Sequence, residues 1–279
     1  MKQIPEKFRI SIKPLITEYK TKIRSILPVR DLIDIPYPNS YYLEMFLKAR
    51  AEIERARVRE ISFFPIEVKN WIDSLALITQ VTYKKSNLDW SHGYDLYKLI
   101  TSRLTILPEQ EIHVFESGTA RGFSSLVMTK AILDSGKIPN VITIDILGHA
   151  RPRYWNCIGD IYGRRSRVQL LADYKEFTGY IKYIQCRSGL FQSTKPFLNK
   201  IDFAFLDGPH TYSAVKKEFE FVRRLSDHKT FIILDDVDSK NYPGVFRLYK
   251  ELSEEKVYKV TILNNKRGLV LFEKVLNLD

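Results

Sequence analysis

The chain is poor in cysteine and contains no long apolar run. Its two cysteines, Cys157 and Cys186, form no disulfide framework, and their separation matches no zinc-binding pattern. No window approaches the ~18–20 apolar residues of a membrane span, and the first residues lack the continuous apolar core of a signal peptide. We therefore expect a soluble protein of a reducing compartment, the cytoplasm, with no membrane span.

Motifs for nucleic-acid binding are also absent, although the chain is basic. The 279 residues include 44 Lys and Arg against 33 Asp and Glu, a net charge of +11. Residues 1–90 hold 16 of the basic and 11 of the acidic residues, so the excess is spread along the chain. A solvated basic surface is the simpler interpretation, and we do not expect a nucleic-acid partner.

The rhythm of apolar residues divides the chain near residue 90. Residues 1–90 are expected to form a helical N-terminal extension that covers a site or makes a homo-oligomer contact. Residues 91–279 alternate short apolar strands with helices, which indicates a buried parallel sheet with helices on both faces. We predict a doubly wound α/β fold with a mostly parallel seven-stranded sheet and a C-terminal antiparallel hairpin. The expected strands are 112–116, 141–145, 183–186, 203–207, 231–235, 257–263 and 268–274.

A glycine-containing loop follows the first of these strands, in the run Glu116-Ser117-Gly118-Thr119-Ala120-Arg121-Gly122. Gly118 permits close approach of the backbone to a ligand, and Gly122 permits a tight entry into the next helix. Free N–H groups at that helix start would suit an anionic group. The dinucleotide fingerprint G-x-G-x-x-G is absent, because Ala120 stands where its second glycine would be. A purely structural glycine turn is the alternative.

An acid also ends the second strand. Asp145 lies where a carboxylate can accept hydrogen bonds from the two hydroxyls of a ribose. The alternative is an aspartate that caps a helix or a turn. Together with the glycine loop, Asp145 favours a ligand that contains a nucleoside.

The strongest signal is a group of acids after the fourth and fifth strands. Asp207 ends one strand, His210 follows in the next turn, and Asp235 and Asp236 end the neighbouring strand. Carboxylates held this close raise one another's pKa unless a cation neutralises them. Oxygen ligands suit Mg²⁺, Mn²⁺ or Ca²⁺, and the imidazole of His210 suits a general base. The alternative is a helix cap with two solvated aspartates.

These segments together resemble the class I S-adenosylmethionine-dependent methyltransferases. The likeness covers about residues 90–275 and is greatest to the metal-dependent sugar and macrolide-glycoside O-methyltransferases. Its D-G-x-H-x-Y segment, joined to the later D-D, is fairly specific, whereas the glycine loop is generic. The matching segments are Glu116–Gly122, Ile144-Asp145, Phe205–Tyr212, Leu234-Asp235-Asp236 and Pro243-Gly244-Val245.

The resemblance implies a role for each matching position. It makes Asp207, Asp235 and Asp236 ligands of Mg²⁺, with His210 as the catalytic base beside Asp207. It places S-adenosylmethionine along the glycine loop and against the acid of the second strand. The implied cofactor-binding residues are Glu116, Gly118, Thr119, Ala120, Gly122, Ser124 and Asp145, with Ser188 as a substitute for the acid that relatives carry near the adenine.

Two departures from the family pattern affect the site. Ser117 stands where relatives have a hydrophobic residue, and Pro209 replaces a commonly acidic one. The segment 147–180 is long for a strand connection, and we expect an insertion or lid. Its Trp155 and Arg153 could contact a sugar with acidic neighbours, as could Tyr212; a packed lid anchored by Trp155 is the alternative.

The predicted function is therefore transfer of a methyl group from S-adenosylmethionine to a hydroxyl of a sugar or glycosylated metabolite, with Mg²⁺ assistance. One alternative is methylation of RNA or another anionic polymer, although the Asn/Asp-Pro-Pro-aromatic motif of many amino-group methyltransferases is missing. The chain could also be a non-catalytic cofactor-binding or assembly protein, or it could catalyse a different reaction on the same scaffold, because a fold does not fix its chemistry.

Overall fold

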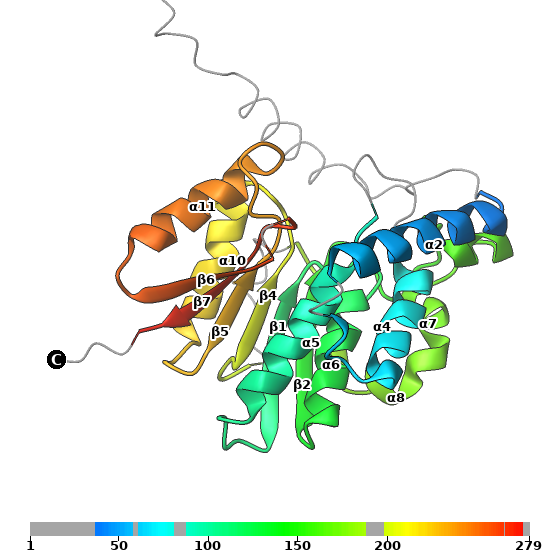
Figure 1. Cartoon of the computed structure of the whole chain (residues 1–279). Coiled ribbons are helices and arrows are strands. Elements are labelled where there is room, and N and C mark those ends of the chain that lie inside the picture. Colours follow the sequence, from blue (N-terminus) through cyan, green and yellow to red (C-terminus); the bar gives the residue numbers. More distant parts are fainter. Residues whose placement is uncertain (1–36, 58–60, 81–87, 188–197, 265, 276–279) are drawn as a thin grey trace, which may run out of the picture.

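A seven-stranded sheet forms the centre of the molecule (Figure 1). The computed structural model describes residues 37–57, 61–80, 88–187, 198–264 and 266–275. The sheet order is β3-β2-β1-β4-β5-β7-β6. The strands are β1 Glu111–Ser117, β2 Ile138–Asp145, β3 Ile181–Gln185, β4 Phe203–Leu206, β5 Phe231–Leu234, β6 Tyr258–Asn264 and β7 Leu269–Lys274.

Strands β1 to β5 pair in parallel, and β7 runs antiparallel to both β5 and β6. The predictions of a mostly parallel sheet and of a C-terminal hairpin are thus confirmed. The four residues of β4 and the four of β5 are all buried. Strands covered on both faces must be apolar at every position, which is why these segments read as continuous apolar runs.

Helices cover both faces of the sheet. Val114 of β1 belongs to a core cluster with α4, α5 and α6, and its neighbour Phe115 belongs to a second cluster with α10 and α11. Alternate side chains of one strand point to opposite faces, so the sheet is the middle layer of three. The helices are α2 Asn39–Ala56, α4 Ile66–Thr79, α5 Ser91–Leu104, α6 Phe123–Asp134, α7 Arg167–Leu170, α8 Lys175–Thr178, α10 Tyr212–Arg224 and α11 Pro243–Glu254, with 3₁₀ turns η2 Ile158–Tyr162 and η3 Ala172–Tyr174.

The described helices before residue 90 pack onto the core of the sheet. Phe46 and Ile53 of α2 share a core cluster with Val114. Asp73 of α4 accepts hydrogen bonds from Trp90 Nε1 at 2.9 Å and Tyr94 Oη at 2.6 Å. The division at residue 90 stays a prediction, but α2 and α4 are joined by buried contacts to the residues that follow it. None of the described helices is long and apolar enough to cross a membrane.

The strand order places the expected site. Chain order reverses at β1, because β2 lies on one side of it and β4 on the other. In open α/β sheets, ligands bind beyond the carboxyl ends of the strands at such a switch point. Here the carboxyl ends of β1, β2, β4 and β5 carry every strand-terminal acid that the sequence singled out.

Candidate active site

Gly118 brings the glycine loop after β1 against the end of β4. Its φ is +94°, and a Cβ at this position would lie 2.0 Å from the carbonyl oxygen of Asp207. Asp207 in turn donates its N–H to the carbonyl of Ser117 at 2.9 Å. Only glycine allows the loop after β1 to approach the end of β4 this closely.

The glycine loop uses its own N–H groups. Gly118 donates to the Ile144 carbonyl at 2.9 Å, Ala120 to Asp145 Oδ2 at 2.6 Å, and Gly122 to the Thr119 carbonyl at 2.7 Å. Ala120 adopts a left-handed φ of +46°. These donors are directed into the protein, so this part of the loop does not form the N–H cradle that holds a phosphate.

Glu116 lies beneath this loop and is fully buried. Its carboxylate accepts hydrogen bonds from the hydroxyls of Ser124 and Ser125 on α6 and from Thr143 of β2, the last at 2.6 Å. Burial raises the pKa of Glu116, and the three hydroxyls oppose that rise. The predicted contact of Glu116 and Ser124 with the cofactor is not supported by this geometry, because both side chains are occupied inside the protein.

Two further residues of the loop turn inward. Thr119 is buried, and its Oγ1 lies 2.5 Å from Oγ1 of Thr143. Gly122, with a φ of +91°, immediately precedes α6, and a Cβ there would lie 2.9 Å from Leu171. The cofactor-binding roles of Thr119 and Gly122 therefore stay predictions, with the backbone as the available contact surface.

Asp145 is held at the end of β2 by two backbone N–H groups. Ala120 and Leu147 donate to its two oxygens at 2.6 and 2.7 Å. Burial raises its pKa, and the hydrogen bonds and nearby arginines oppose the rise. Each carboxylate oxygen has a second lone pair, and the side chain keeps a tenth of its exposure. Its ribose-binding role stays a prediction compatible with this geometry.

Two buried arginines connect the loop to the 147–180 segment in opposite directions. Arg121 of the loop donates to the Trp155 carbonyl, and Arg167 of α7 donates Nε and Nη2 to the Ala120 carbonyl at 2.9 and 2.8 Å. Arg167 also lies 3.8 Å from Asp145. Sequence reasoning missed both roles, because the residue type alone does not show whether an arginine is buried or solvated.

The 147–180 segment is folded on itself rather than open as a binding surface. Trp155 is 1% exposed, and its Nε1 donates to the Arg165 carbonyl at 2.7 Å. Arg153 is buried, pairs with Arg165 through the backbone and lies over the Trp155 ring. The predicted contact of Trp155 with a sugar is corrected here, because the indole has no exposed face; the alternative, a packed segment anchored by Trp155, describes it better.

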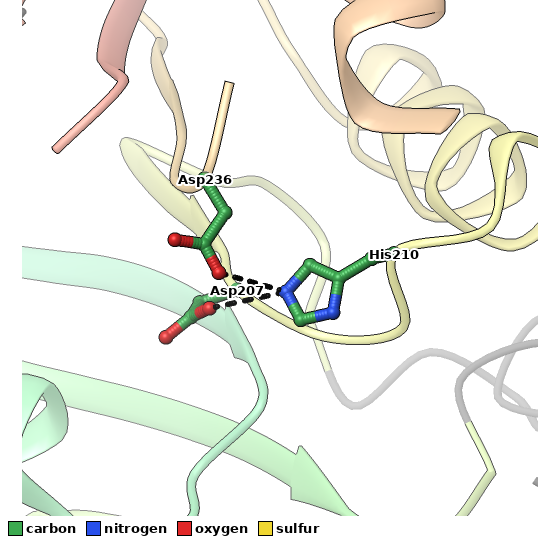
Figure 2. A group of neighbouring side chains, drawn as sticks. All are labelled: Asp207, His210 and Asp236. Atoms are coloured by element: carbon green, nitrogen blue, oxygen red, sulfur yellow. Dashed lines mark ion pairs between the residues drawn. The ribbon is translucent and has the colours of Figure 1, made fainter. Parts of the chain in front are cut away.

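Near the ends of β4 and β5 the side chains of Asp207, His210 and Asp236 point toward one another (Figure 2). His210 Nε2 lies 2.9 Å from Asp236 Oδ2 and 4.0 Å from Asp207 Oδ1. One ligand atom from each of the three residues lies within 4.8 Å of the others. Burial, followed by the charges of Asp235 and Asp236, raises the pKa of Asp207 well above its usual range.

Local backbone geometry directs these side chains together. Asp236 has a left-handed φ of +58°, which turns the chain directly after β5. The Tyr242 ring lies 4.3 Å from the His210 ring, centroid to centroid. Gly244 brings α11 against the turn, since a Cβ there would lie 2.4 Å from the His210 carbonyl. The imidazole is therefore held from the β5 side and from the α11 side.

Asp235 departs from the expected set of ligands. It is 1% exposed, and Arg267 Nε lies 3.1 and 3.0 Å from its two oxygens. Among the described residues, the group able to hold a cation consists of Asp207, His210 and Asp236. The three-aspartate site stays a prediction, and in this structure Asp235 is paired with Arg267.

The remaining predicted residues are placed as follows. Tyr212 begins α10, where its hydroxyl donates to Glu251 of α11 and its ring lies under Arg247. Ser188 lies outside the described residues. Ser117, the departure from the family pattern, is buried and donates to Glu218 of α10 at 2.6 Å. Gly208 makes room for this bond, because a Cβ there would lie 2.1 Å from Ser117 Oγ.

Comparison with known proteins agrees with the fold. Residues 115–237, which run from β1 to the end of the β5 turn, match the model of a methyltransferase domain family. The matched residues include the glycine loop and Asp145 as well as Asp207, His210 and Asp236.

Solved structures of similar fold include proteins named as O-methyltransferases. The O-methyltransferase TomG from Streptomyces achromogenes, involved in tomaymycin synthesis and solved with S-adenosylmethionine, is 16% identical with a TM-score of 0.50; the match covers 73% of this chain and 88% of TomG. A Klebsiella pneumoniae protein, provisionally assigned as an O-methyltransferase, is 15% identical with a TM-score of 0.50, covering 84% and 98%. No curated protein matches the sequence significantly. The prediction of a Rossmann-like methyltransferase fold is confirmed, and the domain boundary at residue 90 stays a prediction.

Proposed function

We propose that the chain is an S-adenosylmethionine-dependent O-methyltransferase in which His210 removes the proton of the acceptor hydroxyl. The observation that carries the proposal is the convergence of His210, Asp207 and Asp236 at the switch point of a methyltransferase domain. An imidazole beside two carboxylates suits proton removal, which methyl transfer to oxygen requires near neutral pH.

The glycine loop supports a cofactor without phosphate groups. The N–H groups of Gly118, Ala120 and Gly122 are donated within the protein, whereas a dinucleotide requires such donors for its pyrophosphate. S-adenosylmethionine carries a ribose and an amino acid but no phosphate. The free lone pairs of Asp145 would then accept the ribose hydroxyls.

The acidic group fits a divalent cation. His210 Nε2 is buried and makes no hydrogen bond of good geometry among the described residues, although Asp236 is 2.9 Å away. Burial and neighbouring negative charge raise the pKa of Asp207, a cost that a cation would remove. Asp207 and Asp236 would hold Mg²⁺ or Mn²⁺. When bound, the ion lowers the pKa of a coordinated hydroxyl.

Each of the chain's own residues then has a separate role in the reaction. His210 takes the hydroxyl proton, and Asp236 stabilises the imidazolium that forms. The Tyr242 ring fixes the plane of the imidazole. Gly118 places the cofactor loop directly against Asp207, so the acceptor oxygen can face the sulfonium methyl in line. Orientation of this kind supplies much of the rate of a methyl transfer.

We propose a sugar or glycosylated metabolite as the acceptor. The resemblance of the Phe205–Tyr212 and Leu234–Asp236 segments to sugar O-methyltransferases supports this choice. Trp155 and Arg153 no longer contribute to it, because both are buried. Cytoplasmic location and homo-oligomer formation remain predictions from the sequence.

Transfer of labelled methyl groups to a panel of glycosides tests the proposal. His210→Gln should lower kcat by about 10²–10⁴, the usual contribution of a general base, with unchanged affinity for S-adenosylhomocysteine. His228→Gln is the matched control, because His228 is exposed near the opposite edge of the sheet. Equal rates for wild type and His210→Gln would contradict the base role.

A further inference from the structure

Arg267 connects three segments at the edge of the site. It follows β6, and its Nε lies 3.1 and 3.0 Å from the two oxygens of Asp235 after β5. Its Nη1 donates to the Asp89 carbonyl, just before α5, at 3.4 Å. The Asp235 side chain is fully buried, and that of Arg267 is 18% exposed. The pair is thus shielded from solvent, where a charge without its partner is costly.

The hairpin that carries Arg267 is held in place independently. Gly268 has a φ of +79°, and a Cβ there would lie 2.7 Å from the backbone of Val237. Val237 donates its N–H to the Gly268 carbonyl at 3.0 Å. Asn264 donates to the Ser91 hydroxyl at 3.0 Å. The position of the guanidinium over Asp235 is therefore fixed by a backbone contact on one side and by a side-chain hydrogen bond on the other.

The two adjacent aspartates have different partners. Asp235 is directed to Arg267, and Asp236, after the left-handed turn, is directed to His210. We propose that Arg267 is a positioning residue that neutralises Asp235 in place of a metal ion and excludes this carboxylate from the ligand set. The cation site of the proposed function then has Asp207 and Asp236 as its protein ligands, His210 stays free to take the proton, and Arg267 limits the affinity of the site.

Binding of Mn²⁺ alone to the metal-free full-length chain, measured by titration calorimetry, tests this inference. Asp235→Asn should leave the affinity within about twofold of wild type, whereas Asp236→Asn should weaken it by roughly 10–100-fold. Arg267→Met frees Asp235 and should strengthen Mn²⁺ binding about tenfold. Adding Asp235→Asn to Arg267→Met should abolish that gain, which a merely structural arginine would not produce.

Two outcomes would overturn the inference. One is a loss in Asp235→Asn as large as that in Asp236→Asn; the other is an unchanged or weaker affinity in folded Arg267→Met, including no binding at all. If Arg267→Met does not fold, the double variant decides: it should fold, because both buried charges are gone, and its failure to do so contradicts the pairing. The inference rests on the proposed cation site but not on methyl transfer, since failure to bind S-adenosylhomocysteine would refute the proposed function and leave these affinities unaffected.

Discussion

The carboxyl ends of β1 and β2 differ from those of β4 and β5 in how their acids are partnered. Around β1 and β2, Glu116 is fully buried under three hydroxyl donors, and Asp145 is held by two backbone N–H groups. Around β4 and β5, the side chains of Asp207 and Asp236 keep 26% and 19% of their exposure and face an imidazole. An acid at the end of a strand is thus either buried under hydrogen-bond donors of the protein or left partly exposed beside another charged group.

Which of the two arrangements an acid adopts depends on the donors that neighbouring residues supply. The start of α6 supplies Ser124 and Ser125 to Glu116, and α7 supplies Arg167 beside Asp145. Near β4 and β5, only Asp235 receives such a partner among the described residues, Arg267. In the proposed function, the residues around β1 and β2, the first half of the site, support the cofactor. Those around β4 and β5, the second half, keep charged groups available for chemistry.

Breaking the contact between the halves should have the largest effect. Gly118→Ala places a Cβ 2.0 Å from the Asp207 carbonyl at a φ of +94°, so we expect a loss of roughly 3 kcal/mol or more in the free energy of unfolding. Gly136→Ala is the control, because its φ is +72° but nothing lies within 4 Å; it should cost about 1 kcal/mol. Urea denaturation measures both, and equal losses would show that the close approach is unimportant.

Removing the guanidinium of Arg167, beside Asp145, should have the next largest effect on the free energy of unfolding. Arg167→Met leaves Asp145 and Glu116 buried without this neighbour, and a lost partner of a buried charge costs about 3 kcal/mol. The control is Arg164→Met, since Arg164 is exposed over the Tyr154 ring and should change stability by less than about 0.5 kcal/mol. Thermal unfolding with S-adenosylhomocysteine present and absent measures both variants. Wild-type stability and unchanged ligand affinity in Arg167→Met would show that Arg167 does not stabilise this part of the site.

The smallest expected effect concerns acid stability. Burial, and then the charge of Arg167, lower the pKa of His149 from 6.5 to about 4. Between these values the unfolded chain binds a proton that the folded chain does not, so stability falls as the pH falls from 6.5 to 4. His149→Gln should remove less than about 1 kcal/mol of this fall, since the ring is partly exposed. Urea curves across this range check it; identical slopes in both proteins would contradict the shift.

Much of the fold could be predicted because the central strands β4 and β5 are buried on both faces and so are apolar throughout. The boundaries were less predictable. Strand β2 begins at Ile138 rather than Val141, because Pro139 pairs with β1 while β3 pairs only from Val141 onward, which leaves the missing N–H of the proline without consequence. Helix α11 begins at Pro243, where a proline at the first helical position was an available signal.

The site was predictable where residues are close in the chain. Asp207 and His210 are three residues apart, and Asp236 ends the adjacent strand, so sheet topology alone brings them together. Arg267 and Arg167 were missed because their partners lie 32 and 47 residues away. Trp155 was misread because its burial depends on how the 147–180 segment folds on itself. No local pattern carries that information.

Isothermal titration of S-adenosylhomocysteine into the metal-free protein tests the central claim most directly. The account predicts one binding site in the wild type and nearly the same affinity in Asp236→Asn, because the first half holds the cofactor and the second acts on the acceptor. It also predicts weaker binding in Asp145→Asn. Absence of binding by folded wild-type protein, or loss of binding in Asp236→Asn with none in Asp145→Asn, would contradict it.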